Sequence, residues 1–242
     1  MKIRFEIKLF LIISIIFLNK IKSQNKNAIE IIEKSIDAHG GKSNLDEIKK
    51  IKYSKKTFFY DHLGKIKNEI HQVITHEFNP YKTEIISGDE FQKTDGIVTE
   101  LAKNGKKIYD FESLKKVKST LDGAFYVFWQ PMKLKDPETI MNYLGEVTLP
   151  NQKNAHAIEI SYLNGSDKWN FYFDTSSYLL VATEVNHNNK ISLIYTTDFN
   201  YNKYGVFHYK RESYKVTENR SKLILQASYI YEVLDISKKI IY

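Results

Sequence analysis

Apolar and polar residues are arranged along this chain in three different patterns. Near the N-terminus, an apolar run broken only by Ser14 extends from Leu9 to Leu18. Two later stretches have apolar residues at helical spacing, and most of the remaining chain alternates with a period of two, which is typical of strands with one buried face. The pattern therefore predicts a β-rich chain with few helices.

The N-terminal apolar run predicts a cleavable signal peptide. Lys2, Arg4 and Lys8 precede the run, and the small residue Ser23 follows a short polar stretch. Ten helical residues rise only about 15 Å, well short of the roughly 30 Å hydrocarbon core of a bilayer. We therefore expect cleavage after Ser23, a single mature domain of residues 24–242, and no transmembrane span in that domain.

The predicted leader indicates a location outside the cytoplasm, and composition then narrows the class of the mature chain. The leader holds five of the 36 basic residues and one of the 29 acidic residues, so the formal net charge falls from +7 to +3. This smaller charge weakens the case for nucleic acid as a partner. The chain has no cysteine, which excludes disulfides, thiolate metal sites and a lipid-modified cysteine after the leader. We expect a periplasmic or secreted protein.

The mature chain is predicted to open with one helix. Asn27 and Glu30 have the spacing of a capping box, and Gly40 and Gly41 are expected to end the helix. His39, beside the negative end of the helix dipole, is expected to be partly charged. The core-facing side is predicted to carry Ile29, Ile32 and Ile36.

A second helical stretch is predicted from Glu112 to Trp129, before Pro131. Ser119 and Asp122 could cap a break, so one long helix and two short ones both remain open. The apolar residues at helical spacing are Leu114, Val117, Leu121, Ala124, Phe125 and Phe128.

From Ile48 onward, the sequence consists of β-branched and aromatic runs separated by turn residues such as Asp95-Gly96 and Asn104-Gly105. Trp169, Phe171 and Phe173 are predicted to share a dry face, opposite a wet face. The expected fold is mainly β (α+β): a large curved antiparallel sheet with an N-terminal helix and an interior helical lid.

No motif predicts catalysis. The chain has no G-x-S-x-G elbow, and a cysteine nucleophile is excluded. His71 and His76 lie at an odd separation in one predicted strand, so they point to opposite faces and cannot share a metal. We therefore predict no catalytic residue, no metal site and no cofactor.

Several short motifs resemble the lipoprotein-carrier superfamily. They are Ala38 to Gly41, Asp136-Pro137, Asn142 to Val147, Phe171 to Asp174 and Tyr178 to Leu180, in that order after a signal peptide. Together they are similar to an uncharacterised branch of the LolA-like periplasmic proteins. The resemblance implies an incomplete antiparallel β-barrel around helices, with an apolar cavity for acyl chains.

These expectations combine into a non-enzymatic envelope protein that binds a lipid, an acyl chain or a lipidated protein. Large apolar groups where the second helix becomes a Pro-bounded loop suit a lid over such a cavity. The predicted cavity residues are Leu121, Phe125, Phe128, Trp129, Met132, Trp169, Phe171 and Phe173. One alternative is an envelope interaction or sensor protein that binds a polypeptide partner, with the cavity serving as core. A hydrolase is the third hypothesis.

Overall fold

The computed structural model describes residues 25–239 apart from 163–167, 188–189 and 218–221. A helix over residues 25–38 comes first, followed by the short helix α2 (Lys42–Asp46). The first strands are β1 (Ile48–Tyr60), β2 (Ile66–Phe78), β3 (Tyr81–Ser87), β4 (Glu90–Thr94), β5 (Thr99–Lys103) and β6 (Lys106–Ile108). Helix α3 (Phe111–Phe128) and the 3-10 helix η1 (Met132–Lys135) follow. The remaining strands are β7 (Thr139–Thr148), β8 (Asn154–Tyr162), β9 (Lys168–Asp174), β10 (Leu180–His187), β11 (Lys190–Asn202), β12 (Gly205–Val216) and β13 (Leu223–Lys238).

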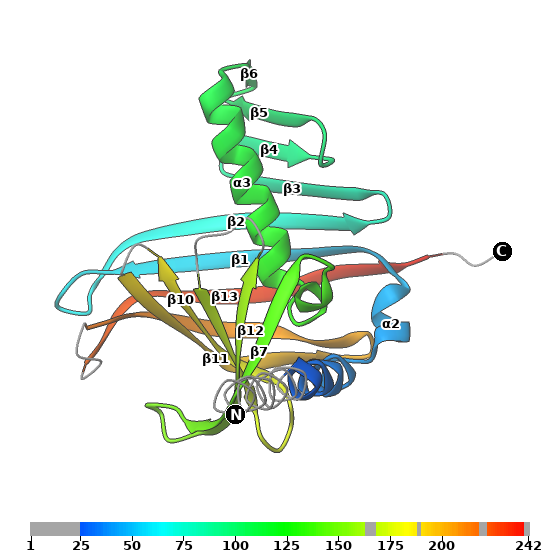
Figure 1. The fold of residues 1–242 in the computed structure, drawn as a ribbon. Helices are drawn as coiled ribbons and strands as arrows, with labels where there is room; N and C mark the ends of the chain where they lie inside the picture. Colours follow the sequence, from blue (N-terminus) through cyan, green and yellow to red (C-terminus); the bar gives the residue numbers. More distant parts are fainter. Residues whose placement is uncertain (1–24, 163–167, 188–189, 218–221, 240–242) are drawn as a thin grey trace, which may run out of the picture.

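All the strands belong to one 13-stranded sheet, in the order β6-β5-β4-β3-β2-β1-β13-β12-β11-β10-β9-β8-β7. Each neighbouring pair is antiparallel, including the central pair of first and last strands, β1 and β13. The chain therefore adds strands from the central β1 to the edge strand β6. It then crosses through α3 and η1 to the opposite edge strand β7 and adds strands back to the centre, where β13 pairs with β1. Figure 1 shows α3 lying across one face of the strongly curved sheet. The expected curved antiparallel sheet, open at its edges and carrying few helices, is confirmed.

The face that carries α3, here called the inner face, holds the main hydrophobic core. Phe171 and Phe173 are fully buried there, and Trp169 packs against the same cluster. The opposite face is not wet throughout, because Tyr172 and Ala182 belong to a second buried cluster on that side. The predicted wet face is thus wrong at this end of the sheet, where the β7–β8 connection around Leu149 adds apolar cover.

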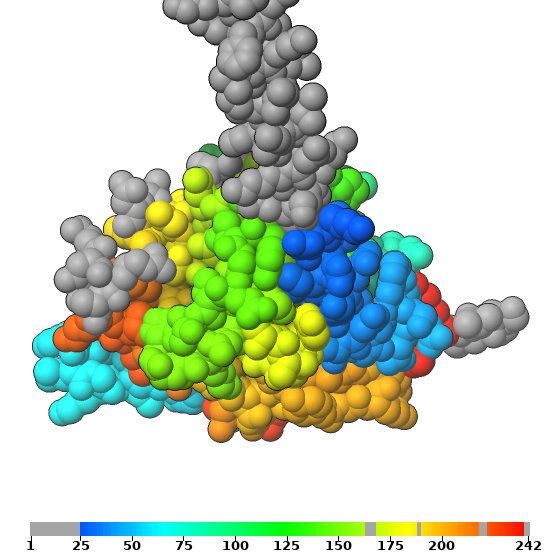
Figure 2. Space-filling model, turned by 60° about the horizontal axis from the view of Figure 1, so that its bottom comes forward, coloured from blue at the N-terminus to red at the C-terminus, as the bar shows by residue number. Residues whose placement is uncertain are grey.

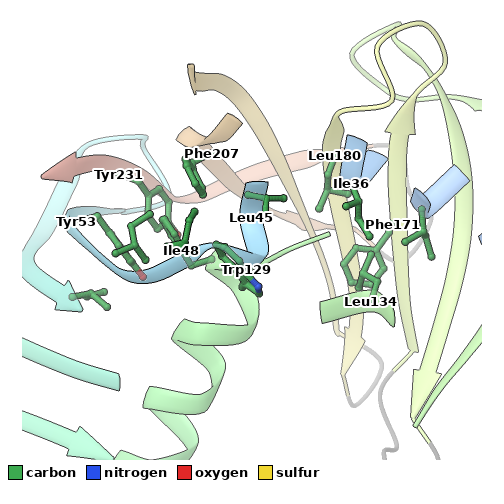
Figure 3. Close-up of a cluster of buried hydrophobic side chains, with 14 of the residues drawn as sticks. Ile36, Leu45, Ile48, Tyr53, Trp129, Leu134, Phe171, Leu180, Phe207 and Tyr231 are labelled. Carbon is green, nitrogen blue, oxygen red and sulfur yellow. The ribbon is translucent and has the colours of Figure 1, made fainter. Parts of the chain in front are cut away.

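The core extends from the central strands to the end of α3. Tyr53 of β1 stacks on Phe128 of α3 with their ring centroids 4.0 Å apart. Figure 3 shows Tyr53 and Tyr231 in one group, Leu134 and Phe171 in another, and Trp129 at the end of the helix. Burying side chains of this size contributes about 1.5–3 kcal/mol each, so the core fixes where α3 ends against the sheet.

Helix α3 is a single helix. Its N-cap is Asp110, whose side chain accepts a hydrogen bond from the Ser113 N–H at 2.8 Å. Asp122 does not cap a break, because its carboxylate is bound by Lys118 Nζ at 2.6 Å and by the Tyr81 hydroxyl at 2.9 Å. After the helix, Trp129, Gln130 and Leu134 are buried. This segment is therefore packed into the core, and the cover over the inner face is α3 itself.

The N-terminal helix departs from its prediction at both its start and its inner face. Residues 25 and 26 are already helical, so Asn27 does not cap the helix. Ile29 is 43% exposed, whereas Ile32 and Ile36 are buried as expected. Ala28, Ile31 and Ser35 are also buried.

The helix lies on the surface beside η1 and the β9–β10 turn, as the blue, green and yellow segments of Figure 2 show. Lys135 binds Glu33 at 2.7 Å, and Lys34 lies 5.1 Å from the ring centroid of Tyr178.

The end of the N-terminal helix forms a close junction with β12. Gly40 has φ +124°, and a Cβ there would lie 2.9 Å from the Gly205 Cα, so no larger residue fits without movement. His39 Nδ1 donates to the Val206 carbonyl at 2.7 Å, and His39 Nε2 accepts from the Leu180 N–H at 3.2 Å. Burial lowers the pKa of His39 to about 4. The predicted partly charged imidazole is wrong, because loss of water outweighs the helix dipole.

The predicted signal peptide, residues 1–23, lies outside the described residues. Within the described ranges, no helix is both long and apolar enough to cross a membrane.

Candidate functional site

A cavity of about 250 Å³ lies between α3 and the inner face of the sheet. An engineered cavity of about 150 Å³ is already large enough to hold benzene, so this space admits a larger apolar group. The lining residues come from α3, the segment after it and eight strands: Tyr53, Lys55, Gln72, Ile74, Ile85, Thr120, Gly123, Ala124, Val127, Gln130, Trp169, Thr183, Ile194, Arg211, Tyr229 and Tyr231.

Small side chains on α3 create the space. Thr120, Gly123, Ala124 and Val127 have the spacing i, i+3, i+4 and i+7, which places them on one face of the helix. A Cβ added at Gly123 would meet nothing within 4 Å, and its backbone does not have a positive φ. A glycine inside a helix is less stable than alanine by about 1 kcal/mol. Neither close packing nor backbone geometry therefore requires glycine here, and its absent side chain widens the cavity.

The sheet supplies the apolar floor. Adjacent strands β1, β2 and β3 place Tyr53, Ile74 and Ile85 in one row across the inner face, because Tyr53 pairs with Ile74 and Ile74 pairs with Ile85. Tyr231 of β13 and Ile194 of β11 continue the floor beyond β1. Most of this wall is therefore aromatic or aliphatic and can contact a ligand without needing a hydrogen bond.

Three polar side chains of the cavity lining are deeply buried: Arg211, Gln130 and Thr183. Arg211 and Gln130 are each 3% exposed. Arg211 Nη2 donates to Thr183 Oγ1 at 3.3 Å, but its Nε has no hydrogen-bond partner, and neither does the side-chain amide of Gln130. Lys55 Nζ lies 5.3 Å from the ring centroid of Tyr229. None of the lining residues, all of which are described, is acidic.

The cavity adjoins a second hollow that reaches the surface. Gly123, Val127 and Trp169 border both spaces, and the second is also lined by the exposed Lys115 and Ser119. A ligand could thus enter past Gly123 and Trp169.

All eight cavity residues predicted from the sequence belong to the main core cluster or pack against it. Trp169 alone among them lines the 250 Å³ cavity. Leu121, Phe128, Phe171 and Phe173 are buried at 2% exposure or less, and Trp129 packs between Phe78 and Phe207. Phe125 packs against Tyr81, and Met132 also packs against the core.

The lining residues that the sequence analysis missed could have been found from the small side chains on one face of α3. Large aromatic side chains fill space, so a search for them finds the packed core. The cavity instead follows the small face of α3, from Thr120 to Val127, about a quarter turn away from Leu121 and Phe125. Arg211 had a weaker signal, as a basic residue within a strand. Its burial depends on β11 and β13, which lie on either side of it.

His76 is buried beside the cavity, next to the lining residue Tyr53. His76 Nε2 and Nδ1 lie 3.0 Å from the Tyr53 hydroxyl and the Thr83 hydroxyl, and burial lowers its pKa to about 3. Among the described residues, no group of three or more His, Cys, Asp or Glu side chains could hold a metal ion. The opposite orientations of His71, which is exposed, and buried His76 are confirmed.

Solved structures align with most of this chain at very low sequence identity. A DUF1329 family protein from Desulfovibrio piger is 7% identical, with 88% of this chain and 93% of that chain aligned and a TM-score of 0.51. A LolA superfamily protein from Nitrosomonas europaea is 8% identical, with 89% and 94% aligned and a TM-score of 0.47. The lipoprotein LppX of Mycobacterium tuberculosis is 8% identical, with 89% and 97% aligned and a TM-score of 0.32. The alignment with the Desulfovibrio piger protein shows that the two chains share a fold.

Sequence comparison gives a family without an assigned activity. No curated protein matches the chain. Residues 7–212 match DUF6503, a family of unknown function, and the chain belongs to that family.

Proposed function

We propose that this protein binds an acyl chain, free or as part of a lipid or lipidated protein, in the cavity between α3 and the sheet. The observation that carries the proposal is Gly123, a mid-helix glycine that no packing contact or backbone angle requires and that borders both the cavity and its outer hollow. The aromatic and aliphatic floor supports the same role.

Binding would be driven by removal of the chain from water. Each buried methylene contributes about 0.8 kcal/mol, which corresponds to roughly fourfold in affinity. In a series of ligands of increasing chain length, the dissociation constant should therefore fall about fourfold per methylene and then level off when the cavity is full. A series without such a limit would indicate adsorption to an exposed apolar surface.

Trp169 provides the direct readout, because it lines the cavity and Trp129 is the only other tryptophan of the chain. In a Trp129→Phe background, titration with a fatty acid should shift the emission of Trp169. Binding that leaves this emission unchanged would place the ligand elsewhere.

Gly123→Leu tests the location of the ligand. The added Cβ has free space, and leucine is a better helix former than glycine, so we expect the variant to fold and to lose acyl-chain binding. Lys116→Leu is the matched control, since it puts the same side chain on an exposed position of α3 outside the cavity. Equal binding by Gly123→Leu and wild type would contradict the proposal.

Extraction of protein purified from its own host separates this function from the alternative. A co-purifying lipid that is lost in Gly123→Leu supports the acyl-chain site. Absence of lipid, together with no binding in the titrations, would favour a protein that binds a polypeptide partner and uses the inner face only as core.

A further inference from the structure

Arg211 is a buried charge that the fold leaves incompletely paired. It is 3% exposed on β12 and lines the cavity. The Thr183 hydroxyl, at 3.3 Å, accepts a hydrogen bond from its Nη2, while Nε is buried without a partner. Within the described ranges, no Asp or Glu forms an ion pair with Arg211, although ion pairs elsewhere join many surface lysines to acids.

Burial of the Arg211 guanidinium destabilises the folded protein unless another group supplies a negative charge. A guanidinium stays protonated, so it cannot escape burial by losing its proton. Buried charges in proteins are normally paired, because an isolated ion loses much of its hydration. A single hydroxyl supplies a partial dipole, not the full negative charge that would balance the guanidinium.

The surroundings of Arg211 reinforce the need for an anion. Lys55 is a second cation in the same wall, and the buried amide of Gln130 offers an unused N–H donor. With no acid among the lining residues, the cavity combines an apolar floor with two positive charges. An apolar chain that ends in an anionic head group matches both features.

We propose that the ligand of this cavity is an anionic amphiphile whose carboxylate or phosphate head group pairs with Arg211. Its chain lies along the floor toward the opening at Gly123 and Trp169. The planar guanidinium presents its N–H donors as a fork that matches two oxygens of such a head group. This inference rests on the proposed acyl-chain function and specifies the ligand class.

The test compares three ligands with the same twelve-carbon chain, each below its micelle concentration: dodecanoate, methyl dodecanoate and dodecyl phosphate. A hydrogen bond to a charged group contributes about 1.5–3 kcal/mol, so at least one anion should bind wild type roughly tenfold to hundredfold more tightly than the ester. The ratio between the two anions then identifies the head group. Equal binding of the ester and both anions would overturn the inference.

Substitution of Arg211 assigns the preference to this side chain. Arg211→Met should bind the ester as well as wild type does and should lose the preference for the anion, and Arg211→Lys should restore part of it. Lys210→Met is the control, because Lys210 is the exposed neighbour on β12 and its loss should leave the preference intact. An unchanged preference in Arg211→Met would contradict the role of Arg211.

The outcomes distinguish a failure of the anionic head group from a failure of the proposed acyl-chain binding. If neither the ester nor the anions bind, the acyl-chain function itself fails. If all three bind equally and Gly123→Leu abolishes their binding, the cavity function holds and only the anionic head group is refuted. The comparison of ligands on wild type decides the matter even if Arg211→Met does not fold.

Discussion

Two buried polar side chains near β12 have opposite environments. His39, at the junction with the N-terminal helix, uses both ring nitrogens: Nδ1 donates to the Val206 carbonyl and Nε2 accepts from the Leu180 N–H. Arg211, in the cavity, retains its charge and leaves Nε without a partner. Burial also lowers the pKa of His39 to about 4, so it is neutral near pH 7.

The difference separates a structural role from the binding role that we propose for Arg211. A buried polar group whose hydrogen bonds are complete joins segments and needs nothing more. A buried charge with an unused donor beside an open space is destabilising by itself and becomes favourable only when a partner arrives. The glycines show the same contrast, since Gly40 permits close backbone contact and Gly123 has no contact at its missing Cβ.

The largest expected effect is the loss of stability at acidic pH, through buried His39 at the junction and buried His76 in the core. Burial depresses the pKa of His39 to about 4 and that of His76 to about 3, both below the unfolded value. The unfolded chain therefore binds more protons below pH 6.5. The stability is complete above that pH and falls as the pH decreases toward 4. The loss by pH 4.5 should be about 5 kcal/mol from the two residues together.

Urea unfolding at pH 7, 5.5 and 4.5 measures this loss. A free energy of unfolding that stays constant between pH 7 and 4.5 would show that these histidines are not neutral and buried in solution.

The glycine contact at the junction gives the next largest effect. Gly40→Ala brings a Cβ to 2.9 Å from the Gly205 Cα at a positive φ. It should lower the free energy of unfolding by about 2–3 kcal/mol. Gly41→Ala is the matched control, because Gly41 also has a positive φ but nothing lies within 4 Å of its Cβ position. It should lose about 1–2 kcal/mol, from the backbone strain alone. If chemical denaturation showed the same loss of free energy of unfolding in both variants, backbone strain at Gly40 would explain it without the contact to Gly205.

The smallest effect should have the opposite sign. Arg211→Met removes an incompletely paired buried charge, so the ligand-free protein should become more stable by about 1–2 kcal/mol in thermal or chemical unfolding. Lys210→Met, on the exposed side of the same strand, should change stability by less than about 0.5 kcal/mol. A marked loss of stability in Arg211→Met would make Arg211 a structural residue like His39 and would remove the contrast.

Local patterns in the sequence predicted much of the fold. The spacing from Leu114 to Phe128 predicted α3, and the alternation at Trp169, Phe171 and Phe173 predicted the buried face of β9. The start of the first helix was not predicted correctly. The exposure of Ile29 was also missed, because it depends on which side of the helix packs against the rest of the fold. His39 was misjudged for a related reason, since its burial arises from contacts with β10 and β12.

By itself, the sequence determined most of the secondary structure, the β-rich class and the presence of a dry face, because these follow from residue periodicity over short stretches. Only the tertiary structure decided which apolar residues fill space and which leave it open. The large aromatics pack in the core, while the small face of α3 and strands distant in the chain meet to enclose the cavity. The tertiary structure also decided the environment of Arg211, because its burial and the absence of an acidic residue from the cavity lining depend on segments distant in the chain.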